Sequence, residues 1–321
     1  MAKKITVVIN ALTDRHRRQI EATAARYGYT VAFYQSNREA IAHLSDSEVV
    51  YGFGKKLAEA ATGAKWFCSS SAGMDVYRDT AIYQREDVLL SNSSGAYGVT
   101  IAEHIVMVTL ELLRRQMEYM RIVREKRWVR NLSIRSIKGS RITILGTGDL
   151  GRLAASRFRG FAPARVTGVN RRGICDDPVF DVVCPQPEVD RLLPETDILI
   201  MCLPGTRETD RFMDARRLAL LPSHAVLVNV GRGNAVDQRA LADLLEADQL
   251  AGASLDVFEE EPIPRDDPIW TCKNLLITPH IAGNMTLEYT VDYATDLFCE
   301  DLENYCNGLP LNRQVDCSLG Y

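Results

Sequence analysis

The chain has 321 residues, of which 46% are hydrophobic and 25% charged, and its formal net charge at pH 7 is −4. That length suggests two domains, and the composition is typical of a globular protein with a substantial core. The small negative charge implies no general attraction to nucleic acids or anionic membranes, and no apolar run approaches the ~20 residues of a transmembrane helix.

The cysteines favour an intracellular protein. No two of the eight form a C-x-x-C pair, and several lie inside apolar runs. We therefore expect reduced thiols, with no metal site and no disulfide framework, and a cytoplasmic location. The first ten residues, MAKKITVVIN, predict a strand and contain too short an apolar run for a signal peptide.

Residues 1–97 alternate strand-like and helix-like segments. Strands are predicted for residues 4–10, 30–34, 49–51 and 66–68, and helices for residues 14–27 and 38–44. This alternation predicts a parallel sheet covered by helices. The loop SSSAGMD, residues 69–75, follows the fourth strand at the sheet edge where open α/β folds bind ligands. The residues alone leave open whether this loop binds a ligand or is a serine-rich connection.

The pattern becomes helical near Gly98. Thr100 and Glu103 fit a capping box, and the apolar residues after them predict one long helix that runs to about Arg124 and connects two domains. His104 falls within this helix, where a structural role is favoured over a catalytic one. Residues 126–140 are polar and irregular.

Residues 141–172 predict a strand, a glycine turn, a helix and a second strand. Gly146, Gly148 and Gly151 have the G-x-G-x-x-G spacing in the βαβ context that a dinucleotide site requires. In such a unit the first glycine permits a tight turn, and the second lets backbone amides approach a pyrophosphate. The third lets the helix and strand pack closely. We therefore predict a dinucleotide site.

The second strand of this unit ends in Asn170, Arg171 and Arg172. A site selective for NAD usually has an acidic residue about 20 positions after the glycines, where it binds the ribose 2′-hydroxyl. No carboxylate stands here, and two guanidinium groups could hold a 2′-phosphate. We predict that NADP(H) is the preferred cofactor and NAD(H) the weaker alternative; two solvated arginines on a surface turn are the competing interpretation.

Four more apolar runs predict strands at residues 198–202, 225–229, 252–256 and 275–278, and a helical pattern covers residues 285–305. Because the carboxyl ends of parallel strands share one edge, the loops after these strands should meet at the edge that carries the glycine turn. Those loops contain Arg232, His280 and the acidic run Glu259, Glu260 and Glu261.

These groups suit hydride transfer to a 2-oxo acid. The reaction needs a cation for the carboxylate and carbonyl, and an acid that protonates the developing alkoxide. Arg232 can present a planar fork, and His280 has an ordinary pKa of about 6.5, which a carboxylate from the acidic run would raise. Each residue alone also fits a surface or structural role, and their shared sheet edge favours the catalytic one.

In six places the sequence resembles the D-2-hydroxyacid dehydrogenases, which include glyoxylate and hydroxypyruvate reductases and D-3-phosphoglycerate dehydrogenase. The motifs are SSSAGMD, GAYGVTIAEH, GTGDLG, NVGRG, LDVFEEEP and TPHIAG, in the family's order and over nearly the whole chain. The resemblance implies that Arg232, His280 and Glu261 are the catalytic residues, since Glu261 is the glutamate directly before proline.

The resemblance also implies the binding residues. The substrate would contact Ser71, Ala72 and Gly73 as well as Arg232 and His280, and the backbone amides of Ala72 and Gly73 would meet its carboxylate. The implied cofactor-binding residues are Gly146, Gly148, Asp149, Leu150, Gly151, Asn170, Arg171, Arg172, Leu203, Pro204, Val230, Arg232, Asp256, His280 and Gly283.

The implied fold is α/β with two Rossmann-like domains, each a parallel sheet flanked by helices, and an active site in the cleft between them. Residues 1–97 and 285–321 would form a discontinuous substrate domain, and residues 98–284 the dinucleotide-binding domain. Closure of the cleft would expel water. A homodimer is expected, because family members are commonly homodimers.

The reaction expected from the resemblance is NADPH-dependent reduction of a small 2-oxo acid, such as glyoxylate or hydroxypyruvate, to the D-2-hydroxy acid. A D-3-phosphoglycerate dehydrogenase is the first alternative, with Lys55 and Lys56 as weak candidates for a phosphate site. Formate dehydrogenases resemble this branch but lack the glutamate that Glu261 supplies. A dinucleotide-sensing scaffold, similar to the family's transcriptional corepressors, would keep the fold without turnover.

Overall fold

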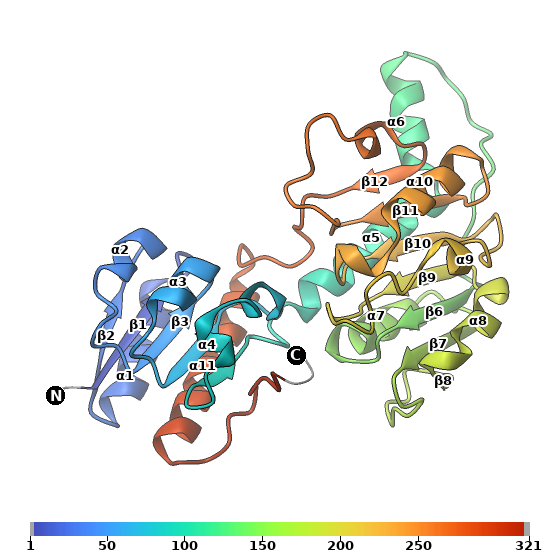
Figure 1. Cartoon of the computed structure of the whole chain (residues 1–321). Helices are drawn as coiled ribbons and strands as arrows, with labels where there is room; N and C mark the ends of the chain where they lie inside the picture. Colours follow the sequence, from blue (N-terminus) through green and yellow to red (C-terminus); the bar gives the residue numbers. More distant parts are fainter. Residues whose placement is uncertain (1–2, 318–321) are drawn as a thin grey trace. The chain divides into compact units, whose positions relative to one another are not determined.

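A computed structural model describes residues 3–317. The chain divides into two compact units (Figure 1), one built from the segments before Gly98 and after Gly283, the other from Gly98–Gly283. Each unit contains one sheet, and every strand pairing within the two sheets is parallel. The predicted class, two parallel sheets flanked by helices, is confirmed.

The first unit has a five-stranded sheet in the order β2-β1-β3-β4-β5. Its elements are β1 (Lys3–Val8), α1 (Asp14–Ala25), β2 (Tyr29–Phe33), α2 (Asn37–Ile41), β3 (Val49–Gly52), α3 (Lys55–Ala60), β4 (Trp66–Ser69), α4 (Ala81–Gln84), β5 (Leu89–Ser91) and α11 (Glu288–Cys306). The ends of the predicted elements differ from the observed ones by up to three residues, and α3, α4 and β5 were not predicted.

Helices cover both faces of this sheet. On one face, Ile20 of α1 and Phe298 of α11 pack with Ile5 and Trp66 of the strands. The opposite face packs against α2 and α3. The long C-terminal helix therefore completes the core of the N-terminal sheet, and this explains why the unit needs both ends of the chain.

The second unit has a seven-stranded sheet in the order β12-β11-β10-β9-β6-β7-β8. Its elements are α5 (Gly98–Leu113), α6 (Gln116–Arg124), β6 (Arg141–Leu145), α7 (Asp149–Arg159), β7 (Arg165–Asn170), β8 (Val182–Pro185), α8 (Val189–Leu192), β9 (Ile198–Met201), α9 (Ala215–Leu218), β10 (Val226–Asn229), α10 (Gln238–Glu246), β11 (Gly252–Leu255) and β12 (Leu275–Ile277). The strand order reverses at β6, and open α/β sheets bind ligands at such a point.

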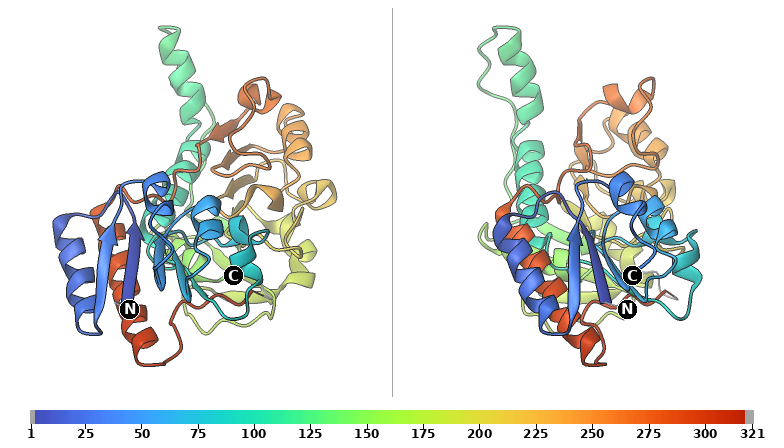
Figure 2. Two further views of the ribbon diagram at one scale, coloured as in Figure 1. Left: turned by 60° about the vertical axis from the view of Figure 1, so that its left-hand side comes forward. Right: turned by 90° about the vertical axis from the view of Figure 1, so that its left-hand side faces the viewer.

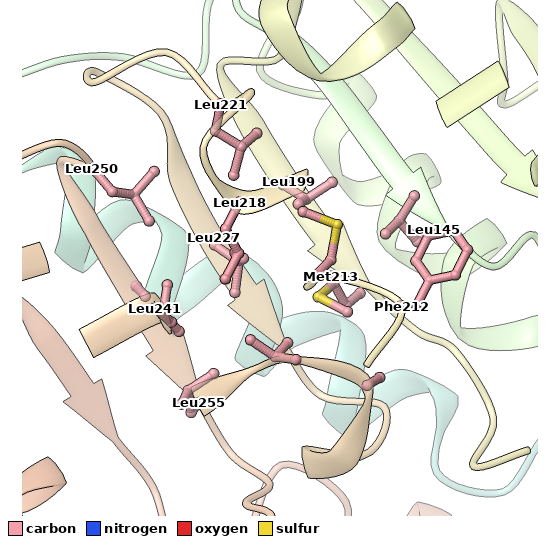
Figure 3. Packing of buried hydrophobic residues seen from close by; sticks show 14 of the residues in the cluster. Leu145, Leu199, Phe212, Met213, Leu218, Leu221, Leu227, Leu241, Leu250 and Leu255 are labelled. Atoms are coloured by element: carbon pink, nitrogen blue, oxygen red, sulfur yellow. The ribbon is translucent and has the colours of Figure 1, made fainter. Parts of the chain in front are cut away.

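Two apolar layers hold this sheet. On one face, the strands pack against α8, α9 and α10 through leucine-rich contacts that include Leu199, Leu227 and Leu241 (Figure 3). On the other face, Ile105 of α5 and Phe158 of α7 pack against β6 and its neighbours. Because both faces are covered, β9, β10 and β11 are buried along their full lengths, which accounts for their unbroken apolar sequences.

The prediction of one long helix from the capping box to Arg124 is wrong. The helix starts at Gly98, so Thr100 lies within the first turn and is not the N-cap. It ends at Leu113, and Arg115 adopts a left-handed conformation with φ 55° before α6 begins. Figures 1 and 2 show α6 and the irregular segment after it reaching away from the seven-stranded sheet.

All eight cysteines are unpaired in the structure. Among residues 3–317, no helix is long and apolar enough to cross a membrane, and no group of histidine, cysteine and carboxylate side chains is arranged to hold a metal ion.

Candidate active site

The three glycines of the β6–α7 turn differ in what a Cβ atom at each position would meet. Gly146 has φ 100°, and a Cβ atom there would lie 2.7 Å from the carbonyl oxygen of Cys202. At Gly151 a Cβ would lie 1.9 Å from the carbonyl oxygen of Gly146, so only glycine permits this approach of helix and turn. At Gly148, by contrast, a Cβ would meet nothing within 4 Å. The turn is thus closed on its protein side and open where a ligand would approach.

Helix α7 begins directly at this open position. Gly148 is its N-cap and offers no side-chain cap to the first amides, and Asp149 and Leu150 are the first two helical residues. Uncapped N–H groups and the positive end of the helix dipole favour a bound phosphate. The residues present therefore fit the pyrophosphate of a dinucleotide.

The turn after β7 is held in shape by Asn170. Its Oδ1 accepts hydrogen bonds from the amides of Arg172 and Gly173, at 3.0 and 2.7 Å, and its Nδ2 donates to Thr147 Oγ1 at 2.7 Å. Asn170 is thereby tied to the glycine turn itself. Arg171 and Arg172 are exposed, and the structure shows no ion pair for either within residues 3–317.

The loop after β10 presents Arg232. Asn229 is buried, its Oδ1 accepts from Gly231 N at 3.0 Å and its Nδ2 donates to Arg232 O at 2.9 Å, which folds the chain tightly at the strand end. Arg232 is half-buried, and its Nη1 donates to Gly231 O at 2.8 Å.

Neighbouring strand-end loops pack closely around this one. A Cβ at Gly231 would lie 2.6 Å from Leu203 O, which brings Val230 beside the Leu203-Pro204 loop that follows β9. A Cβ at Gly233 would lie 1.9 Å from the backbone of Phe258, in the loop that follows β11. The predicted edge is therefore built by backbone contact between adjacent loops.

Asp256 follows β11 and is buried with 2% exposure. Its Oδ1 accepts from Thr278 Oγ1 at 2.6 Å and Ile281 N at 2.9 Å, and its Oδ2 accepts from Ala282 N at 3.0 Å. Its carboxylate therefore forms all three of these hydrogen bonds with the loop after β12. That loop continues to Gly283, the last residue of the unit. The implied contact of Asp256 with a cofactor stays a prediction, and the structure gives this residue a supporting role.

His280 and Glu261 form the central pair. His280 Nδ1 lies 2.7 Å from Glu261 Oε2, and Glu261 Oε1 accepts from Phe258 N at 2.9 Å. The side chains are 51% and 36% exposed, so both groups reach solvent. Glu259 Oε1 accepts instead from the backbone amide of Gln238, and Glu260 is exposed. Of the three glutamates in the acidic run, Glu261 is therefore the one that is hydrogen-bonded to His280.

The pair shifts the titration of both members. The hydrogen bond to Glu261 raises the pKa of His280, outweighing the effect of burial, and the charge of Asp256 adds to the increase. Burial raises the pKa of Glu261, but the hydrogen bonds from His280 and Phe258 N and the charge of Arg232 together hold this pKa below its ordinary value. Both shifts favour the imidazolium–carboxylate form of the pair, in which His280 Nδ1 is hydrogen-bonded to Glu261.

The implied substrate loop belongs to the first unit. Ser71 N donates to Ser69 Oγ at 3.2 Å, and Gly73 N donates to Ser71 Oγ at 3.3 Å. Ala72 is fixed through its carbonyl, which accepts from Asn92 Nδ2 at 3.0 Å. These bonds give the loop a defined shape at the carboxyl end of β4. Lys55 and Lys56 are exposed at the start of α3.

Two supporting residues were missed from sequence. Asn229 shapes the loop of Arg232, and Thr278 bonds to Asp256 beside the loop of His280. Both stand inside the motifs NVGRG and TPHIAG, directly at strand ends. A signal was therefore present, because a polar residue at the end of an apolar strand is placed to form hydrogen bonds with the adjoining loop.

Comparison with known proteins decides the family. The model of "D-isomer specific 2-hydroxyacid dehydrogenase, NAD binding domain" matches residues 106–282. The chain belongs to the D-isomer specific 2-hydroxyacid dehydrogenase family. It is accordingly an NAD(P)-dependent oxidoreductase of 2-oxo and 2-hydroxy acids, as the six motifs predicted.

Individual relatives agree with this assignment. The chain is 30% identical over 289 residues to a glyoxylate/hydroxypyruvate reductase B of Yersinia pestis, covering 87% of this chain and 86% of the relative. A crystal structure of a family member from Aeromonas salmonicida has a TM-score of 0.86 at 29% identity, covering 99% of this chain and 100% of that one. An NADPH-dependent glyoxylate/hydroxypyruvate reductase from Sinorhizobium meliloti, in complex with NADP and sulfate, has a TM-score of 0.81 at 25% identity, covering 99% and 100%.

Proposed function

We propose that this chain reduces a small 2-oxo acid, of the glyoxylate or hydroxypyruvate kind, to the D-2-hydroxy acid with NADPH. The observation that carries the proposal is the His280–Glu261 pair, 2.7 Å between Nδ1 and Oε2, in the same group of strand-end loops as Arg232. An acid, its partner and a cation are the three groups that this reaction requires of the protein.

His280 acts as the proton donor through Nε2. Because Nδ1 bonds to Glu261, the imidazolium keeps one fixed orientation and its Nε2 proton faces away from the pair. When bound, the coenzyme supplies a hydride to the carbonyl carbon of the substrate. The Nε2 proton passes to the carbonyl oxygen, so the product is the alcohol, and His280 is left neutral with Nδ1–H still donating to Glu261.

Arg232 binds the substrate carboxylate and polarises its carbonyl. Its guanidinium offers two parallel donors, which match a 2-oxo acid better than a single ammonium would. As the family resemblance implies, we place the remaining carboxylate contacts in the Ser71–Gly73 loop of the first unit.

The coenzyme preference rests on the turn after β7. Asn170 shapes this turn and leaves the guanidinium groups of Arg171 and Arg172 without carboxylate partners in the described chain. Two free guanidinium groups and no acidic residue suit a 2′-phosphate. The Sinorhizobium relative, which is NADPH-dependent, supports the same preference.

One set of kinetic measurements tests the proposal. NADPH and NADH oxidation are followed with glyoxylate, hydroxypyruvate, pyruvate, phenylpyruvate and branched 2-oxo acids. We expect turnover of the smallest acids and a clear preference for NADPH, which the double variant Arg171→Ala, Arg172→Ala loses through a raised KM for NADPH. Arg191→Ala, which removes an exposed arginine from α8, is the matched control. A preference for NADH would refute the coenzyme proposal, and no turnover of any acid would favour a scaffold.

We also propose a homodimer, formed by the segment that projects from the second unit. Trp128 is 89% exposed and Val123 67% exposed, and nine of residues 114–140 are Lys or Arg while two are Glu. A basic, apolar arm on a chain of net charge −4 is complementary to the body of a second copy. Sedimentation should give a dimer for the native chain and a monomer for a Val123→Ser, Trp128→Ser variant; a native monomer would contradict the proposal.

We propose a cytoplasmic location from the state of the cysteines. All eight are unpaired, and burial raises the pKa of the Cys68 and Cys299 thiols, which protects them from reaction but not from pairing during folding in an oxidising compartment. Cell fractionation of the tagged protein is the direct measurement.

A further inference from the structure

Behind the loop that carries His280, three side chains form a hydrogen-bonded row. His104 of α5 is 9% exposed, and its Nε2 lies 3.4 Å from Thr278 Oγ1. Thr278 Oγ1 in turn lies 2.6 Å from Asp256 Oδ1. The proposed mechanism uses neither His104 nor Thr278, although the row ends on the carboxylate that holds the catalytic loop.

Counting protons fixes the direction of this row. An ionised carboxylate only accepts, so Thr278 must donate its single hydroxyl proton to Asp256. The contact between Thr278 Oγ1 and His104 then requires that Nε2 of the imidazole donates. Burial lowers the pKa of His104, against the charges of Asp256 and Glu111, which raise it, so the ring is neutral with its proton on Nε2.

Asp256, the last residue of the row, is hydrogen-bonded to a strained residue, His280. His280 has φ 53°, a left-handed conformation that costs a non-glycine residue of the order of 1 kcal/mol. Its amide donates to Asp256 O at 2.9 Å, and the carboxylate of Asp256 accepts from the next two amides, those of Ile281 and Ala282. Asp256 therefore accepts hydrogen bonds from three consecutive amides of the strained turn, one through its carbonyl oxygen and two through its carboxylate.

We propose that His104 is a positioning residue for the proton donor and acts through Thr278 and Asp256 on the loop of His280. The proposal rests on the proposed function in taking His280 as the donor. Without the Nε2–H of His104, the Thr278 hydroxyl is free to take another staggered rotamer and leave Asp256. The turn then loosens, and His280 loses its alignment with Glu261.

The test compares His104→Leu with His104→Gln. The glutamine amide keeps an N–H that can donate to Thr278, whereas leucine fills similar volume without a donor. Thr109→Val is the matched control, because Thr109 is buried in the same helix and, within residues 3–317, its hydroxyl bonds only to Ile105 O of that helix.

Two readouts are needed. NMR titration of the His280 imidazole in the protein without ligands reports its alignment with Glu261 independently of turnover. Steady-state kinetics then separate kcat from the KM for NADPH. In His104→Leu we expect His280 to titrate at lower pH than in the native protein, and kcat to fall about fivefold, the effect of one ordinary hydrogen bond. The KM for NADPH should not change, and His104→Gln should restore both values.

An unchanged pKa of His280 in His104→Leu would overturn the inference. So would a His104→Gln variant whose His280 pKa and kcat are the same as those of His104→Leu. If His104→Leu does not fold, the pair Thr278→Val and Thr278→Ser carries the same comparison, because serine keeps the hydroxyl. A shifted titration in a protein that reduces no 2-oxo acid would support the positioning role and refute the proposed function, so the two failures are distinguishable.

Discussion

Replacing Glu261 with glutamine should move the basic limb of the pH profile toward lower pH. In the proposed mechanism, reduction requires the imidazolium form of His280, so activity is present below the pKa of His280 and is lost as the pH rises through it. Because the hydrogen bond and charge of Glu261 raise that pKa, they extend activity to higher pH. Glutamine removes the charge, and it has one acceptor oxygen where the carboxylate uses two, one for His280 Nδ1 and one for Phe258 N.

The size of the effect follows from the distance and exposure of the pair. Two unit charges about 4 Å apart interact by about 1 kcal/mol in water and about 4 kcal/mol near a protein surface. Side-chain exposures of 51% and 36% place this pair toward the aqueous limit. We take about 1.4 kcal/mol, which corresponds to a tenfold change in the population of the imidazolium on the basic side.

The assay is kcat/KM for the 2-oxo acid across the pH range at saturating NADPH. Glu261→Gln should lose about tenfold on the basic limb and little at acidic pH, where His280 is protonated in either protein. Glu260→Gln makes the same charge change one residue away on an exposed side chain, and its profile should match the native one. An unchanged basic limb in Glu261→Gln, or an equal shift in Glu260→Gln, would refute the coupling of this pair.

Three further changes test the fold and the site. Gly151→Ala places a Cβ 1.9 Å from Gly146 O and should lower the free energy of unfolding by about 3 kcal/mol in denaturant melts. Gly148→Ala introduces no clash and should lower it by about 1 kcal/mol or less, the effect of a poorer N-cap, while raising the KM for NADPH. Leu227→Ala removes a fully buried side chain from the core in Figure 3 and should cost about 2–5 kcal/mol of unfolding free energy. Arg232→Lys keeps the charge but loses the planar fork, and kcat/KM for the 2-oxo acid should fall roughly tenfold to 100-fold.

The sheets could be predicted because their strands are buried on both faces. A strand that is buried on both faces has an unbroken apolar sequence, as Val226–Asn229 does, so it can be recognised from sequence. The glycines of the βαβ unit are likewise visible in sequence, because the turn they form admits no larger residue at Gly146 and Gly151. The helix break at Arg115 could not be predicted in this way. No glycine or proline marks it, and arginine is a good helix former, so the left-handed residue there reflects tertiary contacts that override local propensity.

Part of the candidate site could likewise be predicted from sequence, and part could not. Parallel strands put their following loops on one edge, so Arg232, Glu261 and His280 could be grouped from sequence order and strand assignment alone. The choice among Glu259, Glu260 and Glu261 could not be made from spacing. It depends on how the loop after β11 folds back, with Phe258 N donating to Glu261 Oε1 and the other oxygen turned to His280.

The orientation of His280 depends on a group that looks like a binding residue in sequence. An acidic residue at a strand end facing a dinucleotide turn suggests a direct ligand contact, yet both oxygens of Asp256 already accept protein donors. A buried carboxylate whose oxygens accept three protein donors can stabilise a backbone conformation that histidine otherwise disfavours. In the proposed mechanism Asp256 holds the loop of His280 through backbone hydrogen bonds, whereas Glu261 raises the pKa of His280 directly, so substitution of either carboxylate should change the pH profile through a different physical cause.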